Sequence, residues 1–526
     1  MRNRYLYITL LAILGFNSET LAQGAHAKSA PRLVVNITID QLRSDYLEAF
    51  APLYSEKGFK RLMDNGCLFT SASYPFAPVD RASAIASLTT GVTPYYNNII
   101  GEQWLNRQTL RPMTCVDDAK WSGLMTNDAS SPEGISTSTL GDELKMITNG
   151  KAVVYAIAPF RDAAVLSAGH AADGALWIDD KTGNWCSTTY YFKTLPSWAS
   201  AFNSLQGPAK IIGNTTWEPF NSFVGTLNYF MKSGEETSFK HKFSDIRKYQ
   251  QYKTSALVNA DITSLAQQCI AATGMGLDKV TDMLSLTYYA GQFDHRPLTE
   301  CQTELEDTYV RLDHELERLI DYLEERLGKQ QVLVVLTSTG YCDPESTDYG
   351  KYRIPSGTFQ MDRTANLLNM YLGAIWGQGI YVEATFRNQI FLNHKLLENR
   401  KISIKEATGR AQEILTMMSG VRNVYTALQL ITSQNPQLEK IRNGFNPEHC
   451  GDILIEVAPG WEIQNENAVK LAPNRSAFTQ FPIIFYGCDV QAETIKTPVT
   501  TDRIAPTLAR AIRIRAPNAC AAEPLF

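Results

Sequence analysis

The feature that most constrains the fold is a set of short, β-rich apolar runs spread along the chain. The first run covers residues 33–39, and Asp40 and a helix-like segment that starts near Ser44 follow it directly. Similar runs cover residues 152–158, 283–289, 332–337 and 482–486. A strand, an acidic residue and a helix in succession are typical of an α/β sheet. The sequence therefore predicts a central sheet of buried strands.

One long amphipathic helix is predicted over residues 305–327. Its apolar residues recur at spacings of three and four, which places them on one face of a helix. The other face carries acidic side chains, and we interpret it as a solvated surface. These acidic residues are Glu306, Asp307, Glu317, Asp321 and Glu324.

Composition favours a soluble globular chain with a large core. The chain has 526 residues, of which 44% are hydrophobic, and its net charge is −5. The mild acidity and the absence of a basic tract argue against nucleic-acid binding driven by charge. Residues from about 100 to 280 and from about 340 to 450 are less regular, and we interpret both as cap insertions on the α/β core.

The first 22 residues have the pattern of a secretory signal peptide. Arg2 and Arg4 precede a mostly apolar stretch, residues 5–16, that is too short to span a bilayer. We predict cleavage near Ala22, which leaves residues 23–526 as the mature domain in the periplasm or outside the cell. An uncleaved anchor is the alternative. No cysteine lies at the cut, so a lipoprotein is not expected, and no later stretch reads as a membrane helix.

Nine cysteines are present and none forms a CxxC pair, so neither a zinc knuckle nor a thioredoxin-type site is indicated. An exported protein can hold disulfides, but the odd count leaves at least one thiol free or paired between chains. Their connectivity stays open. The cysteines are Cys67, Cys115, Cys186, Cys269, Cys301, Cys342, Cys450, Cys488 and Cys520.

Six segments, in chain order, resemble the bacterial alkaline phosphatases that use a threonine nucleophile, within the alkaline phosphatase and nucleotide pyrophosphatase/phosphodiesterase superfamily. They include V-V-N-I-T-I-D at 34–40, G-F-K-R-L at 58–62, T-G-V-T-P at 90–94, S-A-G-H at 167–170, E-D-T-Y at 306–309 and D-R-I-A-P-T-L at 502–508. The resemblance covers residues 33–525. It implies an α/β fold with an alkaline-phosphatase-like central sheet, helices on both faces, and inserted cap regions over the strand ends. Ligands in such sheets bind at the carboxyl ends of strands.

The resemblance also implies a chemistry that this sequence does not retain. Members of the family hydrolyse phosphate esters with two zinc ions and a covalent intermediate on threonine. Asp40 matches the first zinc ligand, but the nucleophile position holds Arg81, which has no nucleophilic oxygen. The other ligand positions are degenerate as well. They hold Tyr288, Gln292, Thr339, Gly340 and Gln480.

The positions that contact phosphate in the family are replaced too. Phe160 and Asp162 stand where the family has lysine and arginine, and Glu102 stands where it has asparagine. Two acids at a phosphate site would repel the ligand. Because Asp40 and Arg81 fall together at this site, we expect them to form an internal ion pair, since a buried charge needs a counter-charge.

The leading interpretation is therefore an exported pseudoenzyme that needs no cofactor and has a binding or scaffolding role. Its partner would be an envelope protein or another ligand that the sequence does not identify. The alternative is a zinc-dependent phosphomonoesterase or phosphodiesterase with a rearranged site. Asp80, Asp294, His295 and Asp343 lie near the degenerate positions, and Ser83 would be the nucleophile. This alternative requires the ligands to be displaced along the strand ends. Such a displacement argues against it, because a change of register moves the side chain out of the site.

Lone histidines and clustered aromatic residues carry weaker signals. His170 is interpreted as a hydrogen-bonded core residue, and His314 falls on the solvated face of the long helix. His449 lies beside Cys450, but two ligands do not make a metal site. An aromatic cluster is expected mainly in the core, with a ligand or partner surface on the cap as the alternative. The cluster comprises Trp177, Trp185, Tyr190, Tyr191, Phe192 and Trp198.

Overall fold

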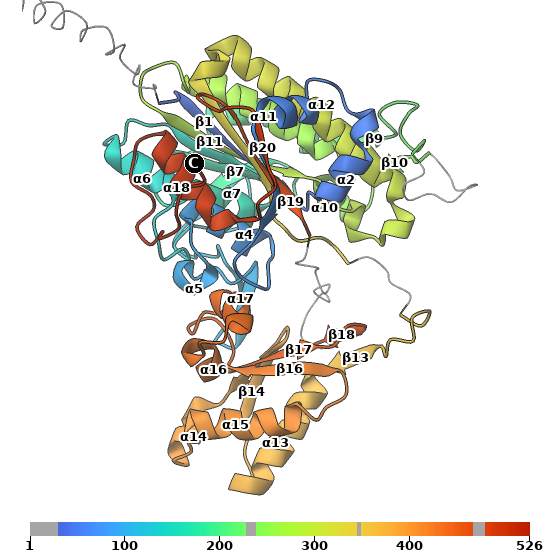
Figure 1. Ribbon diagram of the computed structural model, residues 1–526, viewed down its shortest axis with the longest axis vertical. Helices are drawn as coiled ribbons and strands as arrows, with labels where there is room; N and C mark the ends of the chain where they lie inside the picture. Colours follow the sequence, from blue (N-terminus) through green and yellow to red (C-terminus); the bar gives the residue numbers. More distant parts are fainter. Residues whose placement is uncertain (1–29, 228–237, 345–348, 466–478) are drawn as a thin grey trace, which may run out of the picture.

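The computed structural model describes residues 30–227, 238–344, 349–465 and 479–526 (Figure 1). Within these ranges, eleven strands form one mixed sheet, and all five predicted strands belong to it. Ten strands follow one another across the sheet, and β21 (Val499–Thr500) pairs with β2 beside them. Their order is β20 (Glu493–Ile495), β2 (Cys67–Ser73), β19 (Phe481–Gly487), β12 (Val332–Ser338), β1 (Leu33–Asp40), β11 (Asp282–Tyr289), β6 (Val154–Ile157), β7 (Gly174–Ile178), β8 (Trp185–Thr188) and β5 (Gly123–Leu124).

Strand β1 lies at the centre of this sheet, parallel to β11 on one side and to β12 on the other. Every residue of β1 is buried. Val35, Ile37 and Ile39 pack into the core on one face, and Val34 packs into the core on the other. A parallel strand covered on both faces has no solvent-facing side, which explains its unbroken apolar run.

Helices cover both faces of the sheet, as predicted. The first face packs against α2 (Ser44–Ala49), α3 (Phe59–Asn65), α11 (Leu257–Thr273) and α12 (Gln302–Leu327). The second face packs against α4 (Arg81–Thr90), α6 (Leu140–Ile147), α7 (Arg161–Ala168) and α18 (Ile504–Ala511). Four parallel strands, β1, β12, β11 and β6, therefore end at one edge between these two layers.

The long helix α12 is confirmed, but the prediction that its acidic face is solvated is wrong for two residues. Glu306 and Asp307 are buried. Asp307 accepts hydrogen bonds from Trp217 Nε1 and from the Phe220 amide, each at 2.6 Å. Burial raises the pKa of Glu306 to about 7. Residues 216–225 pack over this face, and periodicity within a helix cannot register such a cover.

Residues 100–280, expected as a cap insertion, are divided between core and periphery. They supply β5, β6, β7 and β8 to the central sheet and α11 to one of its faces. The hairpin of β3 (Gln103–Asn106) and β4 (Arg111–Thr114) lies outside that sheet, as do the short β9 (Thr216–Trp217) and β10 (His241–Lys242). The irregular composition therefore marks loops and small hairpins attached to buried strands.

A second lobe lies below the main sheet in Figure 1 and has its own apolar core. It corresponds to the second expected insertion, but its strands continue to Gln464. The four-stranded sheet has the order β14 (Val382–Phe386), β15 (Gln389–Leu392), β17 (Ile453–Val457) and β16 (Val421–Thr426). The remaining elements are β13 (Gly357–Gln360), α13 (Met361–Trp376), α14 (His394–Asn399), α15 (Ile404–Leu415), α16 (Ala427–Thr432), α17 (Glu439–Asn443) and β18 (Trp461–Gln464).

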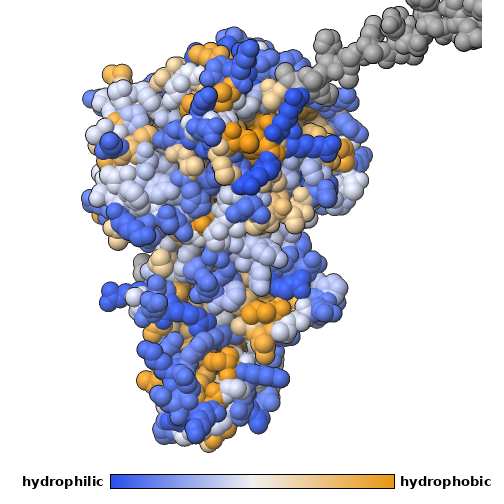
Figure 2. Space-filling model, turned by 90° about the vertical axis from the view of Figure 1, so that its left-hand side faces the viewer, coloured by the Kyte–Doolittle hydropathy of each residue, from blue (hydrophilic) through white to orange (hydrophobic). Residues whose placement is uncertain are grey.

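The surface narrows between the two lobes, and apolar patches are scattered among polar residues on the face shown in Figure 2. None of the helices in the described ranges is long and apolar enough to cross a membrane. The predicted signal peptide, residues 1–22, lies outside those ranges. Eight of the nine cysteines are buried, and Cys520 is partly exposed.

Candidate functional site

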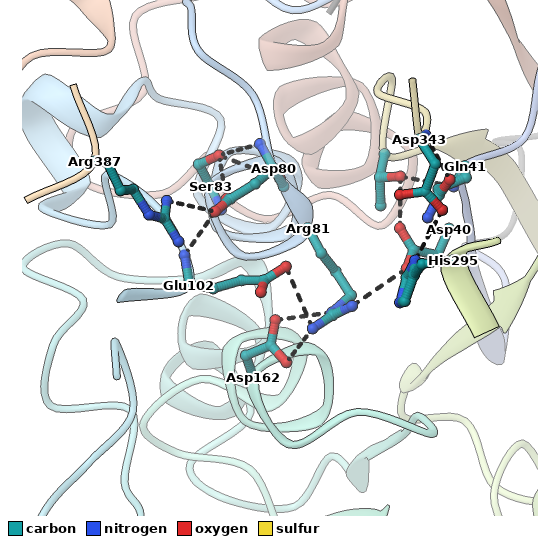
Figure 3. A network of polar contacts seen from close by, with 11 residues as sticks. Asp40, Gln41, Asp80, Arg81, Ser83, Glu102, Asp162, His295, Asp343 and Arg387 are labelled. Carbon is teal, nitrogen blue, oxygen red and sulfur yellow. Dashed lines mark hydrogen bonds and ion pairs between the residues drawn. The ribbon is translucent and has the colours of Figure 1, made fainter. Parts of the chain in front are cut away.

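The candidate site lies where the parallel strands end. Asp40 is the last residue of β1, and Thr339 directly follows β12. Arg81 is the first residue of α4, and Asp162 lies in the first turn of α7. Strand ends and helix starts of an α/β sheet meet at one edge, so residues far apart in sequence converge there. Figure 3 shows Asp40, Arg81, Glu102 and Asp162 around this point.

Asp40 is completely buried, and its two carboxylate oxygens have different partners. Thr339 Oγ1 donates a hydrogen bond of 2.8 Å to Asp40 Oδ1. Arg81 Nη1 lies 3.5 Å from Asp40 Oδ2. The expected Asp40–Arg81 pair is therefore present. The other carboxylate oxygen of Asp40 accepts a hydrogen bond from the Thr339 hydroxyl.

Three carboxylates surround the Arg81 guanidinium. Asp162 binds it in a bidentate manner, through Nε at 2.9 Å and Nη2 at 3.1 Å. Glu102 Oε1 lies 3.4 Å from Nη2, and Asp40 lies on the Nη1 side. Burial alone would lower the pKa of Arg81, but these neighbours, above all Asp162, raise it well above its ordinary value. The group is thus a permanent cation, at the position that the family resemblance assigns to the nucleophile.

The Phe160 ring forms the floor of this arrangement. The guanidinium carbon of Arg81 lies 3.9 Å from the ring centroid, and Lys253 Nζ lies 4.9 Å from the same centroid. Lys253 also forms a hydrogen bond of 2.5 Å with Asp180. Sequence reasoning missed Lys253 and Asp180, because neither falls on a family motif. Phe160, Asp162 and Glu102, identified only as unsuitable for phosphate, all contact the arginine.

Ser83, the alternative nucleophile, forms hydrogen bonds at the start of α4. Its hydroxyl donates to Asp80 Oδ1 at 2.8 Å, and its amide donates to the same oxygen at 3.0 Å. The Asp80 amide donates back to Ser83 Oγ at 3.0 Å. This reciprocal pattern is a capping box, which satisfies amides that a helix start leaves unpaired. Ser83 is completely buried.

Tyr288 and Gln292, which the resemblance places at ligand positions, lie in β11 and just beyond its end. Tyr288 shares a hydrogen bond of 3.0 Å with Thr263 of α11, on the helix-covered side. Its neighbour Tyr289 faces the site instead, and burial followed by the charges of Asp343 and Asp40 raises its pKa well above the ordinary value. Gln292 is buried, and its carbonyl accepts the Tyr289 hydroxyl at 2.7 Å.

Gly340 and Gln480 stand at two further positions that the resemblance assigns to zinc ligands. A Cβ at Gly340 would meet Phe481 at 2.6 Å and Tyr74 at 2.7 Å, and the Gly340 φ of +69° disfavours any other residue. Gln480 is exposed, and its carbonyl accepts the Ser44 amide at 2.9 Å. A side chain that binds metal therefore has no room at Gly340.

The residues proposed for a rearranged metal site do not gather into one. His295 Nδ1 contacts Asp343 Oδ2 at 2.8 Å, and the Asp343 amide donates to Gln41 Oε1 at 3.0 Å (Figure 3). Asp294 points elsewhere and pairs with Arg247 at 2.6 Å. In the described ranges, no group of three or more histidine, cysteine, aspartate or glutamate side chains could hold a metal ion.

The other histidines have structural surroundings. His170 Nδ1 contacts Asp142 at 2.9 Å and its Nε2 contacts the Ile135 carbonyl at 3.1 Å. His449 stacks on Trp104 with ring centroids 4.4 Å apart, and burial lowers its pKa. The His314 ring centroid lies 5.5 Å from that of Phe220.

The aromatic cluster is divided between core and hydrogen-bonding roles. Trp177 and Trp185 are buried in the core. The Tyr190 hydroxyl donates to the His170 carbonyl at 2.9 Å.

A family model decides the ancestry of this site. Residues 34–479 match the family described as type I phosphodiesterase / nucleotide pyrophosphatase. The chain belongs to that family. Two relatives are similar to this chain over nearly its whole length. Alkaline phosphatase PafA of Elizabethkingia meningoseptica is 26% identical over 98% of each chain, and alkaline phosphatase PhoV of Synechococcus elongatus is 28% identical over 98% of each.

The fold of this phosphodiesterase-family chain is also that of a solved alkaline phosphatase. The crystal structure of wild-type PafA superposes with a TM-score of 0.82 and 24% identity, over 95% of this chain and 99% of that one. The predicted α/β fold with an alkaline-phosphatase-like central sheet is therefore confirmed. The relatives establish ancestry, whereas the side chains at the strand ends determine what chemistry remains.

The zinc pair that the family resemblance implies does not fit these residues. Both oxygens of Asp40 are engaged, one by a hydroxyl and one by a guanidinium cation. A zinc ion beside Arg81 would meet a fixed positive charge, which opposes binding. The neighbouring positions offer a phenol, amides, a hydroxyl and a glycine instead of carboxylates and imidazoles.

Proposed function

We propose that this chain is a non-catalytic member of its family, with a binding or scaffolding role in the bacterial envelope. One observation carries the first half of the proposal. The Arg81 guanidinium occupies the nucleophile position and is held there by Asp162, Glu102 and Asp40. A phosphate ester would have to displace a buried ion-pair network in order to enter. The same network leaves neither a nucleophile nor a zinc ligand set, so the proposal includes no cofactor.

Turnover and metal content test the loss of catalysis. Purified mature protein, supplied with zinc, is assayed on an aryl phosphate and an aryl phosphodiester, with bound metal measured in parallel. We expect rates equal to those of the buffer and substoichiometric zinc. Stoichiometric zinc together with turnover that is lost in Asp40→Asn would establish the rearranged zinc phosphatase instead.

Reversion of the nucleophile sharpens this test. Arg81→Thr restores a hydroxyl at the nucleophile position but leaves Tyr288, Gln292 and Gly340 unchanged. Because the hydroxyl would still lack the zinc ion that lowers its pKa, we expect no turnover in this variant. Appreciable hydrolysis by Arg81→Thr would show that the metal site is intact and that only the nucleophile was lost.

The second lobe supports the binding role. Helix α13 exposes three large apolar side chains, namely Leu367 at 42%, Met370 at 72% and Ile375 at 42%. Exposed apolar side chains grouped on one element are typical of a contact surface. A photo-crosslinking residue at Met370, compared with one at the exposed Glu406, tests this in cells. Reproducible adducts from position 370 alone are expected, and equal labelling from both positions would contradict a defined partner surface.

Export belongs to the same proposal. The predicted signal, residues 1–22, would direct the chain through the inner membrane and be removed near Ala22. Cell fractionation and the mass of the mature N-terminus test this. We expect periplasmic or secreted protein that begins close to residue 23. Full-length protein retained in the membrane fraction would indicate the uncleaved anchor.

A further inference from the structure

We infer that Asp40, Glu102, Asp162 and Phe160 together form a guanidinium-binding pocket, which the chain fills with its own Arg81. The inference rests on the proposed loss of catalysis and goes further by assigning a ligand class to the degenerate site. The family resemblance assigns these four positions to phosphate contacts and a zinc ligand. Here they receive a planar cation.

The geometry fits a guanidinium group better than an ammonium group. Asp162 engages Nε and Nη2 in parallel, which requires two N–H groups held in a fixed plane. The ring of Phe160 lies 3.9 Å from the guanidinium carbon, the distance of a stacked cation–π contact. A lysine ammonium group has neither the fork for Asp162 nor a flat face for Phe160.

Arg81 lies among several acidic side chains. Three carboxylates converge on one guanidinium, and the nearby Lys253 is paired with Asp180. Side-chain exposure is 0% for Asp40, 13% for Asp162 and 10% for Arg81. Removing Arg81 would leave the partly desolvated Asp162 without its bidentate partner, which is unfavourable, so an emptied pocket should take up a cation of matching shape.

The pocket walls do not depend on Arg81 alone for their positions. Asp80 fixes the start of α4 and also accepts the Glu102 amide at 2.7 Å. Thr339 holds the other oxygen of Asp40 at 2.8 Å. Asp162 lies in the first turn of α7, where the helix dipole favours a carboxylate. Truncating Arg81 would therefore leave a preformed site.

Chemical rescue of Arg81→Ala tests the inference on the mature protein. Thermal melting is followed while methylguanidinium chloride is added in the low millimolar range. We expect a saturable rise in the melting temperature of the variant by several degrees and no saturable rise for the wild type. Methylammonium chloride at equal ionic strength should need at least tenfold higher concentration. The double variant Arg81→Ala/Asp162→Asn should lose the response.

Arg61 provides a matched control. Its side chain is 13% exposed, close to the 10% of Arg81, and it pairs with Asp321 at 2.6 Å. Arg61→Ala should therefore show no saturable response to methylguanidinium, because only the Arg81 pocket has three carboxylates and a stacked ring. If Arg81→Ala does not fold, Arg81→Gln serves instead. For either variant, failure to respond, or an equal response to methylammonium, overturns the inference.

The remaining rival explanation is that the emptied pocket binds a divalent cation. Three carboxylates without Arg81 could also attract magnesium or zinc, so both ions are tested against the same variant after treatment with a chelator. A stronger stabilisation by either metal than by methylguanidinium would make the pocket a metal site and overturn the guanidinium assignment. Turnover by the wild type would refute the proposed function. The methylguanidinium response of Arg81→Ala is a separate measurement and would still test the guanidinium pocket.

Discussion

At the scale of single residues, Arg81 and its acidic neighbours form one coupled set. An arginine at the nucleophile position would be unfavourable among the basic phosphate contacts of the family, and acids at those contacts would be unfavourable without the arginine. Arg81, Asp162 and Glu102 make sense only together, since each neutralises a charge that another introduces. Such groups are expected to show strong non-additivity when mutated in pairs.

Asp162→Asn tests how much the network contributes to stability. The change removes the bidentate partner of a buried cation, and we expect it to lower the free energy of unfolding by about 3 kcal/mol. Asp321→Asn is the control, because Asp321 pairs with Arg61 but is itself 34% exposed, against 13% for Asp162. Surface pairs contribute about 0–1 kcal/mol. Urea unfolding of both variants decides the point, and equal losses would show that the Arg81 network is no stronger than a surface pair.

At the scale of elements, the start of α4 organises the site. Asp80 caps the helix and also accepts the Glu102 amide, so one side chain positions both Arg81 and its partner. Asp80→Ala should therefore cost about 2 kcal/mol, the upper end for a lost cap. Ser403→Ala removes the cap of α15 in the other lobe and should cost about 1 kcal/mol. Urea unfolding that ranks the two variants in reverse would contradict the double role of Asp80.

The end of β12 has no room for a side chain at Gly340. Gly340→Ala places a Cβ against Phe481 and Tyr74 and forces alanine to φ +69°, so we expect a loss of about 2 kcal/mol or more. Gly409→Ala is the control, since it lies within α15 and a Cβ there meets nothing within 4 Å. That change should stabilise the helix by about 0.5–1 kcal/mol. Thermal melting of both variants measures the contrast, and an unaffected Gly340→Ala would remove the steric argument.

The same elements show what the sequence can and cannot predict. The strands and α12 were predictable because their apolar patterns are local. The Asp40–Arg81 pair was predictable because family motifs place both residues at one site. The contact of Arg81 with Asp162 was not, since the two residues lie 81 positions apart and only the tertiary fold aligns α4 with α7. Burial of Glu306 was missed for the same reason, because the cover comes from another segment.

At the scale of the whole molecule, the hairpin of β3 and β4 connects the core to the second lobe. Arg107, between its strands, contacts Asp452 at 3.2 Å, the Cys450 carbonyl at 2.8 Å and the Phe391 ring at 5.1 Å. His394 Nε2 contacts the same Asp452 at 2.9 Å. The junction thus combines one acid, one permanent cation and one titratable cation, so its strength should depend on pH.

The direction of that dependence follows from the pKa shifts. The hydrogen bond to Asp452 raises the pKa of His394 more than burial lowers it. A raised pKa means that this contribution to stability is complete below the ordinary histidine value and is lost as pH rises through the folded-state pKa. For Asp452, burial raises the pKa, but His394, Arg107 and a backbone amide outweigh burial. The pKa of Asp452 is therefore lowered overall. Its contribution is lost only as pH falls toward the acid range.

Histidine titration by NMR can test the junction directly. We expect His394 to titrate above about 6.5 and His449, whose pKa burial lowers, to titrate below about 6.5. His394→Gln should reduce the loss of stability between pH 6 and 8, because the variant has no proton to release there. Glu383 and Arg107 also face His394, with opposite effects on its pKa, so Glu383→Gln should lower the His394 midpoint slightly. A His394 midpoint at or below that of His449 would show that the Asp452 contact does not persist in solution, and the two lobes would then lack a pH-dependent link at this junction.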